Sequence, residues 1–116
     1  MAAGGSWQLM RLAGILLTAA VLVGRPGTAG AAPRTHTIII DKMKFCAMPK
    51  NVRAGDIILW VNRDIFKHTA TARDRSFNVD LEPSARGKTV VKRSGSFEFY
   101  CTYHPGMKGR LVVAYK

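Results

Sequence analysis

Short runs of alternating apolar and polar residues, separated by turn-forming residues, extend along the chain from position 35 to its end. In 96–101, Phe97, Phe99 and Cys101 alternate with Ser96, Glu98 and Tyr100, which is the period-two pattern of a half-buried strand. No long stretch carries the stripe of apolar residues that an amphipathic helix needs. Strands are therefore predicted at 35–41, 57–61, 68–72, 88–91, 96–101 and 110–115, and a long surface loop at 80–88.

This spacing of short strands also predicts the fold class. Turn signals recur about every ten residues, as is typical of antiparallel sandwiches and barrels. The chain contains no internal repeat and no low-complexity tract. We expect a single all-β domain with the architecture of a Greek-key sandwich.

The first 31 residues have a different pattern. Their only charged side chains are Arg11 and Arg25, which flank an apolar run at 12–23, and small residues follow at 29–31. Because a membrane-crossing helix needs about 20 apolar residues, the run is too short to span a bilayer. The pattern predicts a signal peptide at 1–31, cleaved after Ala31, and a folded domain at 32–116. The alternative is an uncleaved membrane anchor, and either form is exported.

Length and charge limit the classes of function that this chain can have. The 116 residues carry 18 Lys and Arg against 7 Asp and Glu, a formal charge of +11, and cleavage after Ala31 would leave 85 residues with +9. A chain of this length is too short for a catalytic barrel or a dinucleotide-binding domain with a substrate domain. Nucleic-acid binding is disfavoured because the basic residues are dispersed, no recognition helix is visible and the domain is exported. The charge instead predicts acidic partner surfaces.

Two cysteines, Cys46 and Cys101, are the only ones in the chain. In an exported domain the simplest expectation is one disulfide between them. Such a bridge would leave no free thiolate for chemistry. The residues around Cys101 favour a different role.

The segment from Cys101 to Met107 contains soft metal-binding side chains at short, regular spacing. Cys101, His104 and Met107 follow the pattern Cys-x2-His-x2-Met on a loop that leaves a predicted strand, and His68 lies 33 residues before Cys101. Two imidazoles, one thiolate and a weak axial thioether are the ligand set of a blue-copper electron-transfer site. The pattern therefore predicts one copper ion held by His68, Cys101, His104 and Met107.

With these motifs, the chain resembles the cupredoxins, the type 1 blue copper proteins, and within them the amicyanin and plastocyanin-like group. The resemblance covers 34–114 and is most specific in the short ligand loop. It implies an eight-stranded Greek-key β-sandwich with copper at one end, bound by both imidazoles and the Cys101 sulfur, with Met107 at a longer axial distance. The matching segments are KMKF at 42–45, VRAGD at 52–56, WVNRD at 60–64, HT at 68–69 and the loop at 101–109.

The resemblance also assigns supporting roles. It implies that Asn62 hydrogen-bonds to Thr102 and so joins the two ligand-bearing segments, although Asn62 can also be read as an ordinary turn residue. Trp60 is expected in the core. Three apolar residues are expected either in the core or at the rim of the copper end: Met43, Phe45 and Phe66.

Two further residues fall outside the ligand set. Cys46 departs from the pattern expected of the family, and we read it as a free, buried thiol, with a disulfide or a dimer contact as alternatives. His36 has no metal-binding partner at useful spacing and is read as structural or solvated.

These observations predict a periplasmic one-electron carrier that cycles between Cu(II) and Cu(I), with His104 as the exit for the electron. The resemblance suggests a dehydrogenase as donor and a c-type cytochrome as acceptor, and we expect a monomer. Copper storage or delivery is the alternative function. An enzyme such as a nitrite reductase would need a second copper and more than the three histidines present.

Overall fold

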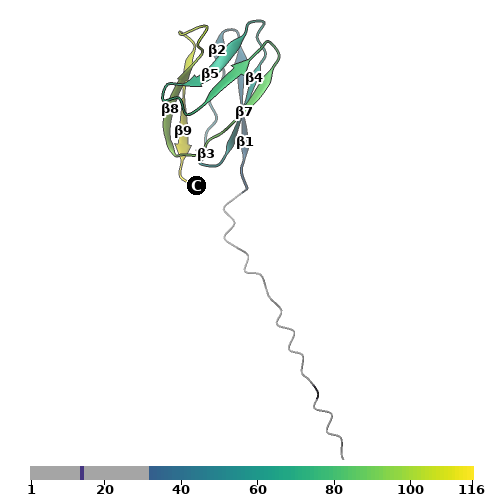
Figure 1. The fold of residues 1–116 in the computed structure, drawn as a ribbon, viewed down its shortest axis with the longest axis vertical. Coiled ribbons are helices and arrows are strands. Elements are labelled where there is room, and N and C mark those ends of the chain that lie inside the picture. Colours follow the sequence, from purple (N-terminus) through teal and green to yellow (C-terminus); the bar gives the residue numbers. More distant parts are fainter. Residues whose placement is uncertain (1–13, 15–31) are drawn as a thin grey trace, which may run out of the picture.

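The structure, a computed structural model, describes Gly14 and residues 32–116 (Figure 1). In this part of the chain nine strands form two sheets that pack face to face, and no helix is long and apolar enough to cross a membrane. The predicted all-β sandwich is confirmed, with nine strands in the described residues where the resemblance implied eight. The predicted signal peptide lies outside the described residues.

The strands of the two sheets are interleaved along the chain. The first sheet has the order β2-β1-β4-β7 and the second the order β3-β9-β8-β5-β6. The strands of the first sheet are β1 (Thr35–Asp41), β2 (Lys44–Phe45), β4 (Ile57–Asn62) and β7 (Arg86–Val90). Those of the second are β3 (Val52–Arg53), β5 (His68–Ala72), β6 (Asn78–Leu81), β8 (Gly95–Tyr100) and β9 (Lys108–Ala114).

The prediction of a long surface loop at 80–88 is wrong. The expected surface loop at 80–88 contains the end of β6 and the start of β7, and only 82–85 connects them. Gly87 indicated a loop, but it lies in β7, where an added Cβ would be 2.4 Å from Cγ1 of Val79 in β6. The glycine therefore permits a close approach between strands of the two sheets.

The core lies between the sheets and follows from strand alternation. Ile38 and Ile40 of β1 and Ile58 and Trp60 of β4 point inward and are fully buried. Phe99 of the second sheet packs edge-on against Trp60, with 5.1 Å between ring centroids. The expected place of Trp60 in the core is confirmed.

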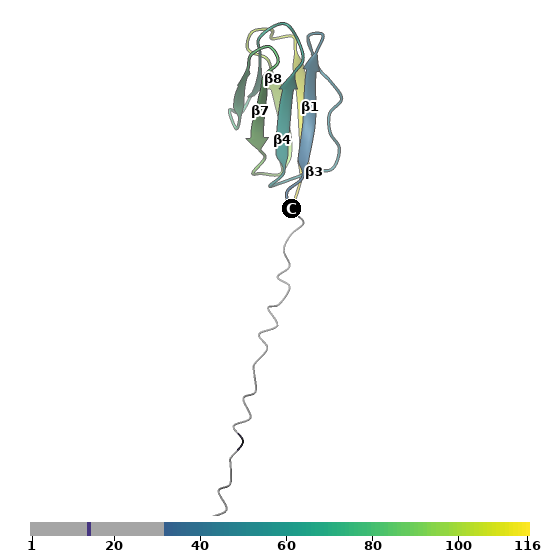
Figure 2. The same ribbon diagram turned by 90° about the vertical axis from the view of Figure 1, so that its right-hand side faces the viewer.

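Strand direction separates the two ends of the sandwich. The β4–β5 and β8–β9 connections lie at one end, which is the upper end in Figure 1. The starts of β1, β4 and β8 and the C-terminus lie at the other end, as the side view in Figure 2 also shows. The predicted copper ligands belong to the first of these ends.

Candidate metal centre

Two neighbouring strands bring the predicted ligands together. His68 is the first residue of β5, and Cys101 directly follows β8. Because β5 and β8 pair antiparallel, with Thr71 opposite Tyr100, the start of one strand lies beside the end of the other. His104 and Met107 come from the loop that connects β8 to β9.

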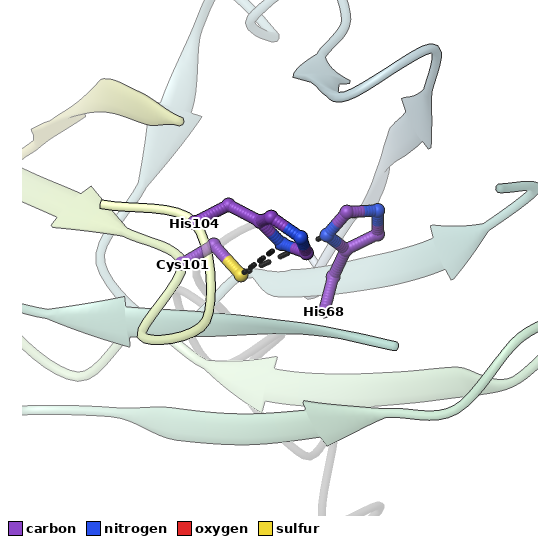
Figure 3. Close-up of side chains that lie close together, drawn as sticks. All are labelled: His68, Cys101 and His104. Carbon is purple, nitrogen blue, oxygen red and sulfur yellow. Dashed lines mark hydrogen bonds between the residues drawn. The ribbon is translucent and has the colours of Figure 1, made fainter. Parts of the chain in front are cut away.

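The three strongest donors converge on one point (Figure 3). The Nδ1 atoms of His68 and His104 each lie 3.7 Å from Sγ of Cys101, and the three ligand atoms are within 4.8 Å of one another. His68 and Cys101 are fully buried, whereas His104 is half-buried. A buried thiolate with two imidazole nitrogens fits a soft metal such as copper.

Met107 lies at the end of the same loop and is 6% exposed. The loop closes through backbone hydrogen bonds, in which N–H of Cys101 donates to O of Met107 (3.0 Å) and N–H of Met107 donates to O of His104 (2.8 Å). These two bonds close the loop on itself. The assignment of the Met107 thioether as axial ligand stays a prediction.

Thr69, which follows His68 directly, ties the two ligand-bearing segments together. Its N–H donates to Sγ of Cys101 (3.3 Å), and its Oγ1 accepts a hydrogen bond from N–H of Thr102 (2.9 Å). The hydroxyl also lies 2.9 Å from that of Thr71, within the same strand. The sequence analysis missed this residue, although its place beside a ligand was a usable signal.

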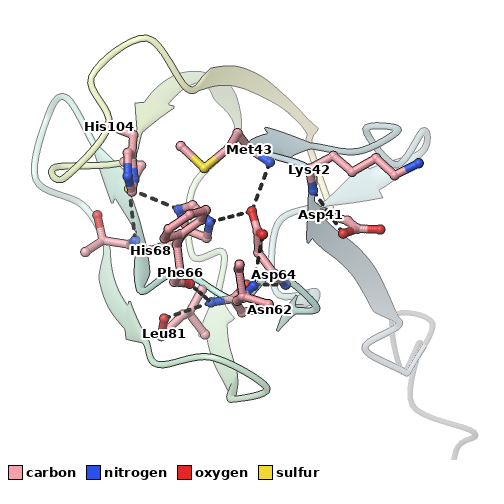
Figure 4. Close-up of polar contacts among 12 residues, drawn as sticks. Asp41, Lys42, Met43, Asn62, Asp64, Phe66, His68, Leu81 and His104 are labelled. Carbon is pink, nitrogen blue, oxygen red and sulfur yellow. Dashed lines mark hydrogen bonds and ion pairs between the residues drawn. The ribbon is translucent and has the colours of Figure 1, made fainter.

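The predicted bond between Asn62 and Thr102 is therefore wrong. The Asn62 amide instead donates to the carbonyls of Phe66 (2.8 Å) and Leu81 (3.0 Å) (Figure 4). It also donates to the carbonyl of Glu82 (3.2 Å). Its Oδ1 accepts N–H of Asp64 (2.9 Å). As the last residue of β4, Asn62 lies beside these carbonyls and holds the β4–β5 loop that leads to His68.

Asp64 was also missed. It contacts the buried His68 ring at Nε2, the nitrogen that does not face Cys101. Oδ2 of Asp64 lies 2.9 Å from Nε2 of His68 and also accepts N–H of Met43 at 2.9 Å (Figure 4). The hydrogen bond from His68 and the backbone bond from Met43 lower the pKa of Asp64. A carboxylate at Nε2 favours the tautomer that leaves Nδ1 free to bind a metal.

The rim of the site contains exposed apolar side chains. Phe66 is 50% exposed, and its ring centroid lies 6.1 Å from that of His104. Tyr103 is exposed beside the Lys67 ammonium, which lies 5.3 Å from the ring centroid. Of the three residues left open above, Phe66 belongs to this rim, and Met43 and Phe45 pack against the core.

Both cysteines are free, so the alternative of a Cys46–Cys101 disulfide is not realised. Cys46 is free, as expected, but it is half-buried rather than buried. His36 is structural, because its Nε2 lies 2.9 Å from Oδ2 of Asp56.

Comparison with known proteins places these features in context. No family model matches the chain. Amicyanin-alpha from Methylorubrum extorquens is 30% identical over 109 residues, which cover 88% of this chain and 92% of the relative. Amicyanin from Paracoccus versutus is 26% identical over 99 residues, which cover 77% of this chain and 73% of the relative.

Solved structures of amicyanins share the fold of this chain. A Cu(I) form of a single-residue mutant of amicyanin aligns with a TM-score of 0.60 at 25% identity, covering 74% of this chain and 88% of the other. Amicyanin from Paracoccus versutus aligns with a TM-score of 0.59 at 23% identity, covering 68% and 80%. The shared fold extends over most of the sandwich.

Proposed function

Because the chain belongs to the cupredoxin family, in its amicyanin group, we propose that it is a type 1 copper electron carrier. The metal ligands in this proposal are His68, Cys101, His104 and Met107. The observation that carries it is the meeting of one buried sulfur and two imidazole nitrogens within 4.8 Å. The observed soft and nitrogen donors are those that a blue-copper site requires.

The surrounding residues suit electron transfer because they hold the donors still. Bound copper would supply one-electron exchange between Cu(II) and Cu(I). The N–H of Thr69 stabilises negative charge on the Cys101 sulfur, and Asp64 fixes the His68 ring. The closed loop from Cys101 to Met107 would limit movement of the donors when copper changes its oxidation state.

His104 is the proposed exit for the electron. Of the four proposed ligands, only His104 is partly exposed to solvent. The exposed side chains of Phe66 and Tyr103 form an apolar surface around it. Small apolar contacts with charged surroundings suit brief encounters between redox proteins. The positive charge favours partners with acidic surfaces, and the family suggests a dehydrogenase donor and a c-type cytochrome acceptor. The proposed location is the periplasm, and the proposed form is a monomer.

Copper delivery and enzymatic reduction fit the site less well. A delivery protein must expose its thiolate to a receiving protein, but Cys101 is fully buried under a closed loop. A second catalytic copper would need further histidines, and the third one, His36, is paired with Asp56. The proposed role is therefore a carrier rather than an enzyme.

The first test is a titration of the mature domain, residues 32–116, with Cu(II) while the visible spectrum is recorded. We expect an intense thiolate-to-copper band that a reductant bleaches and an oxidant restores over repeated cycles. Loss of copper on reduction would favour delivery over electron transfer. A colourless protein with no titratable thiol would overturn the proposal.

Variants then test the ligands separately. Cys101→Ala should abolish the coloured band, whereas Cys46→Ser, the matched control, should keep it. Met107→Ala should keep copper and change the reduction potential, as expected for a weak axial ligand. An unchanged spectrum in the Cys101 variant would refute the ligand assignment.

A further inference from the structure

Five basic side chains gather at the end of the sandwich opposite the metal centre. Two adjoining hollows there, of about 250 and 670 Å³, share Ala54, Gly55 and Lys116 in their walls. The basic residues that line one or both hollows are Arg34, Arg53, Lys92, Arg93 and Lys116. All five are exposed.

The acidic residue in these walls offsets only one of the five positive charges. Asp56 is 6% exposed and turns inward, where it accepts the backbone N–H groups of Arg34 (3.1 Å) and Arg53 (2.9 Å) and contacts His36. Among the ion pairs of residues 32–116, Arg93 alone of the five has an acidic partner, Asp74 at 3.7 Å. The other four basic side chains form no ion pair with an acidic side chain of the described residues.

The remaining surface of this end is suited to lipid headgroups. Tyr115 borders one hollow and is 83% exposed, and aromatic side chains of this kind are favoured at membrane–water interfaces. Clustered lysine and arginine side chains attract anionic lipids. An exposed tyrosine among these cations therefore suits a bilayer surface.

The route of the chain agrees with this orientation. Ala32 and Pro33 line the first hollow, so residues 1–31 join the domain at this end. Cleavage after Ala31 would add a positive α-amino group here. The metal centre lies at the far end of the strands (Figure 1).

We propose that this basic end, formed by Arg34, Arg53, Lys92, Arg93 and Lys116, docks on an anionic phospholipid bilayer. Docking would hold the carrier at the membrane surface with His104 facing away from it. The inference does not depend on the identity of the metal, because it concerns residues at the opposite end of the sandwich.

The test is co-sedimentation of the domain 32–116, which contains all nine strands, with lipid vesicles at low salt. We expect binding to vesicles of phosphatidylcholine mixed with phosphatidylglycerol, and none to phosphatidylcholine alone. The variant Arg53→Gln/Lys92→Gln/Lys116→Gln should weaken binding on the order of 100-fold. Each basic residue near an anionic surface strengthens binding by about the same factor, so three losses multiply.

The matched control is Arg86→Gln/Lys88→Gln/Lys108→Gln, which removes the same charge from exposed positions on β7 and β9. It should bind vesicles nearly as well as the unmodified domain, and far-ultraviolet circular dichroism should show both variants folded. Equal loss in the two variants would mean that only net charge matters and would overturn the proposal. Absence of vesicle binding would also overturn the proposal. If the domain bound immobilised polyglutamate but not vesicles, this end would be assigned to an acidic protein partner.

Discussion

At the scale of single residues, Asp64 connects the metal centre to the loop that leads into it. Its carboxylate is 10% exposed and contacts Nε2 of His68 while it also accepts the N–H of Met43. A carboxylate that accepts a hydrogen bond from one nitrogen of an imidazole makes the other nitrogen a better metal ligand. Better donation favours the more highly charged Cu(II) over Cu(I).

Asp64→Asn should therefore raise the reduction potential of the copper site. The amide oxygen keeps a hydrogen-bond acceptor for His68, so the change removes charge more than geometry. The measurement is a redox titration that follows the blue band. Asp80→Asn is the control, because it removes one carboxylate from an exposed position of β6. A potential equal to that of the control would contradict the role given to Asp64.

Thr69 acts on the same site from the other side. In Thr69→Val the shape is retained, but Thr102 N–H loses its acceptor. Losing one hydrogen bond costs about 0.5–1.5 kcal/mol, so the free energy of unfolding should fall by that amount. Urea unfolding measures this change. Thr71→Val removes a more exposed hydroxyl from the same strand and should have a smaller effect, so equal losses in the two variants would argue against a specific tie.

At the scale of elements, the ligand loop depends on how β9 starts. Gly109, the second residue of β9, pairs with Phe99 of β8, whose ring lies over the glycine. An added Cβ would lie 2.6 Å from Cζ of this fully buried ring. The absence of a side chain at 109 thus allows Phe99 to fill the core two residues before Cys101.

Gly109→Ala should destabilise the domain by about 1–3 kcal/mol, the usual cost of overpacking a core. Thermal unfolding of the copper-free protein would measure it. Gly106→Ala offers the control, since a Cβ there meets nothing within 4 Å. If both substitutions were equally tolerated, the close approach of Phe99 would not constrain the strand.

At the scale of the whole molecule, Asp56 joins the two sheets at the end opposite the metal. It lies between β3 of one sheet and β4 of the other, and its carboxylate holds His36 of β1. Burial alone would raise the pKa of this carboxyl, but backbone N–H donors and the His36 contact outweigh it and lower the pKa to about 2. Folding therefore favours the ionised form.

Because the folded pKa lies below the ordinary value of 3.8, Asp56 stabilises the fold above about pH 4 and loses this effect as pH falls toward about 2. Asp56→Asn should lower the free energy of unfolding by about 2 kcal/mol at neutral pH, since one unit of pKa shift corresponds to about 1.4 kcal/mol. The difference from the unmodified protein should shrink between pH 4 and pH 2. Urea unfolding at several pH values checks this, and a difference independent of pH would contradict it.

The sequence predicted much of the site because metal ligation depends on residue type and spacing. Cys101, His104 and Met107 lie within one short loop, and local geometry limits how far apart they can be. The strands at 35–41 and 68–72 were also predicted with their observed bounds, since alternation along a strand reports which residues face the core. These are local properties that one segment carries by itself.

Tertiary structure decided what depends on contacts between distant segments. It replaced Asn62 with Thr69 as the partner of Thr102, because strand pairing rather than sequence order sets which side chain meets the loop. The expected loop at 80–88 belongs largely to two strands. Gly87 lies within one of them because Val79 of β6 leaves no room for a side chain there. The free state of both cysteines and the gathering of five basic residues at one end also follow from how the strands pack. The sequence alone determined the fold class and the chemistry of the donors, and packing determined which neighbours hold those donors and where the charge collects.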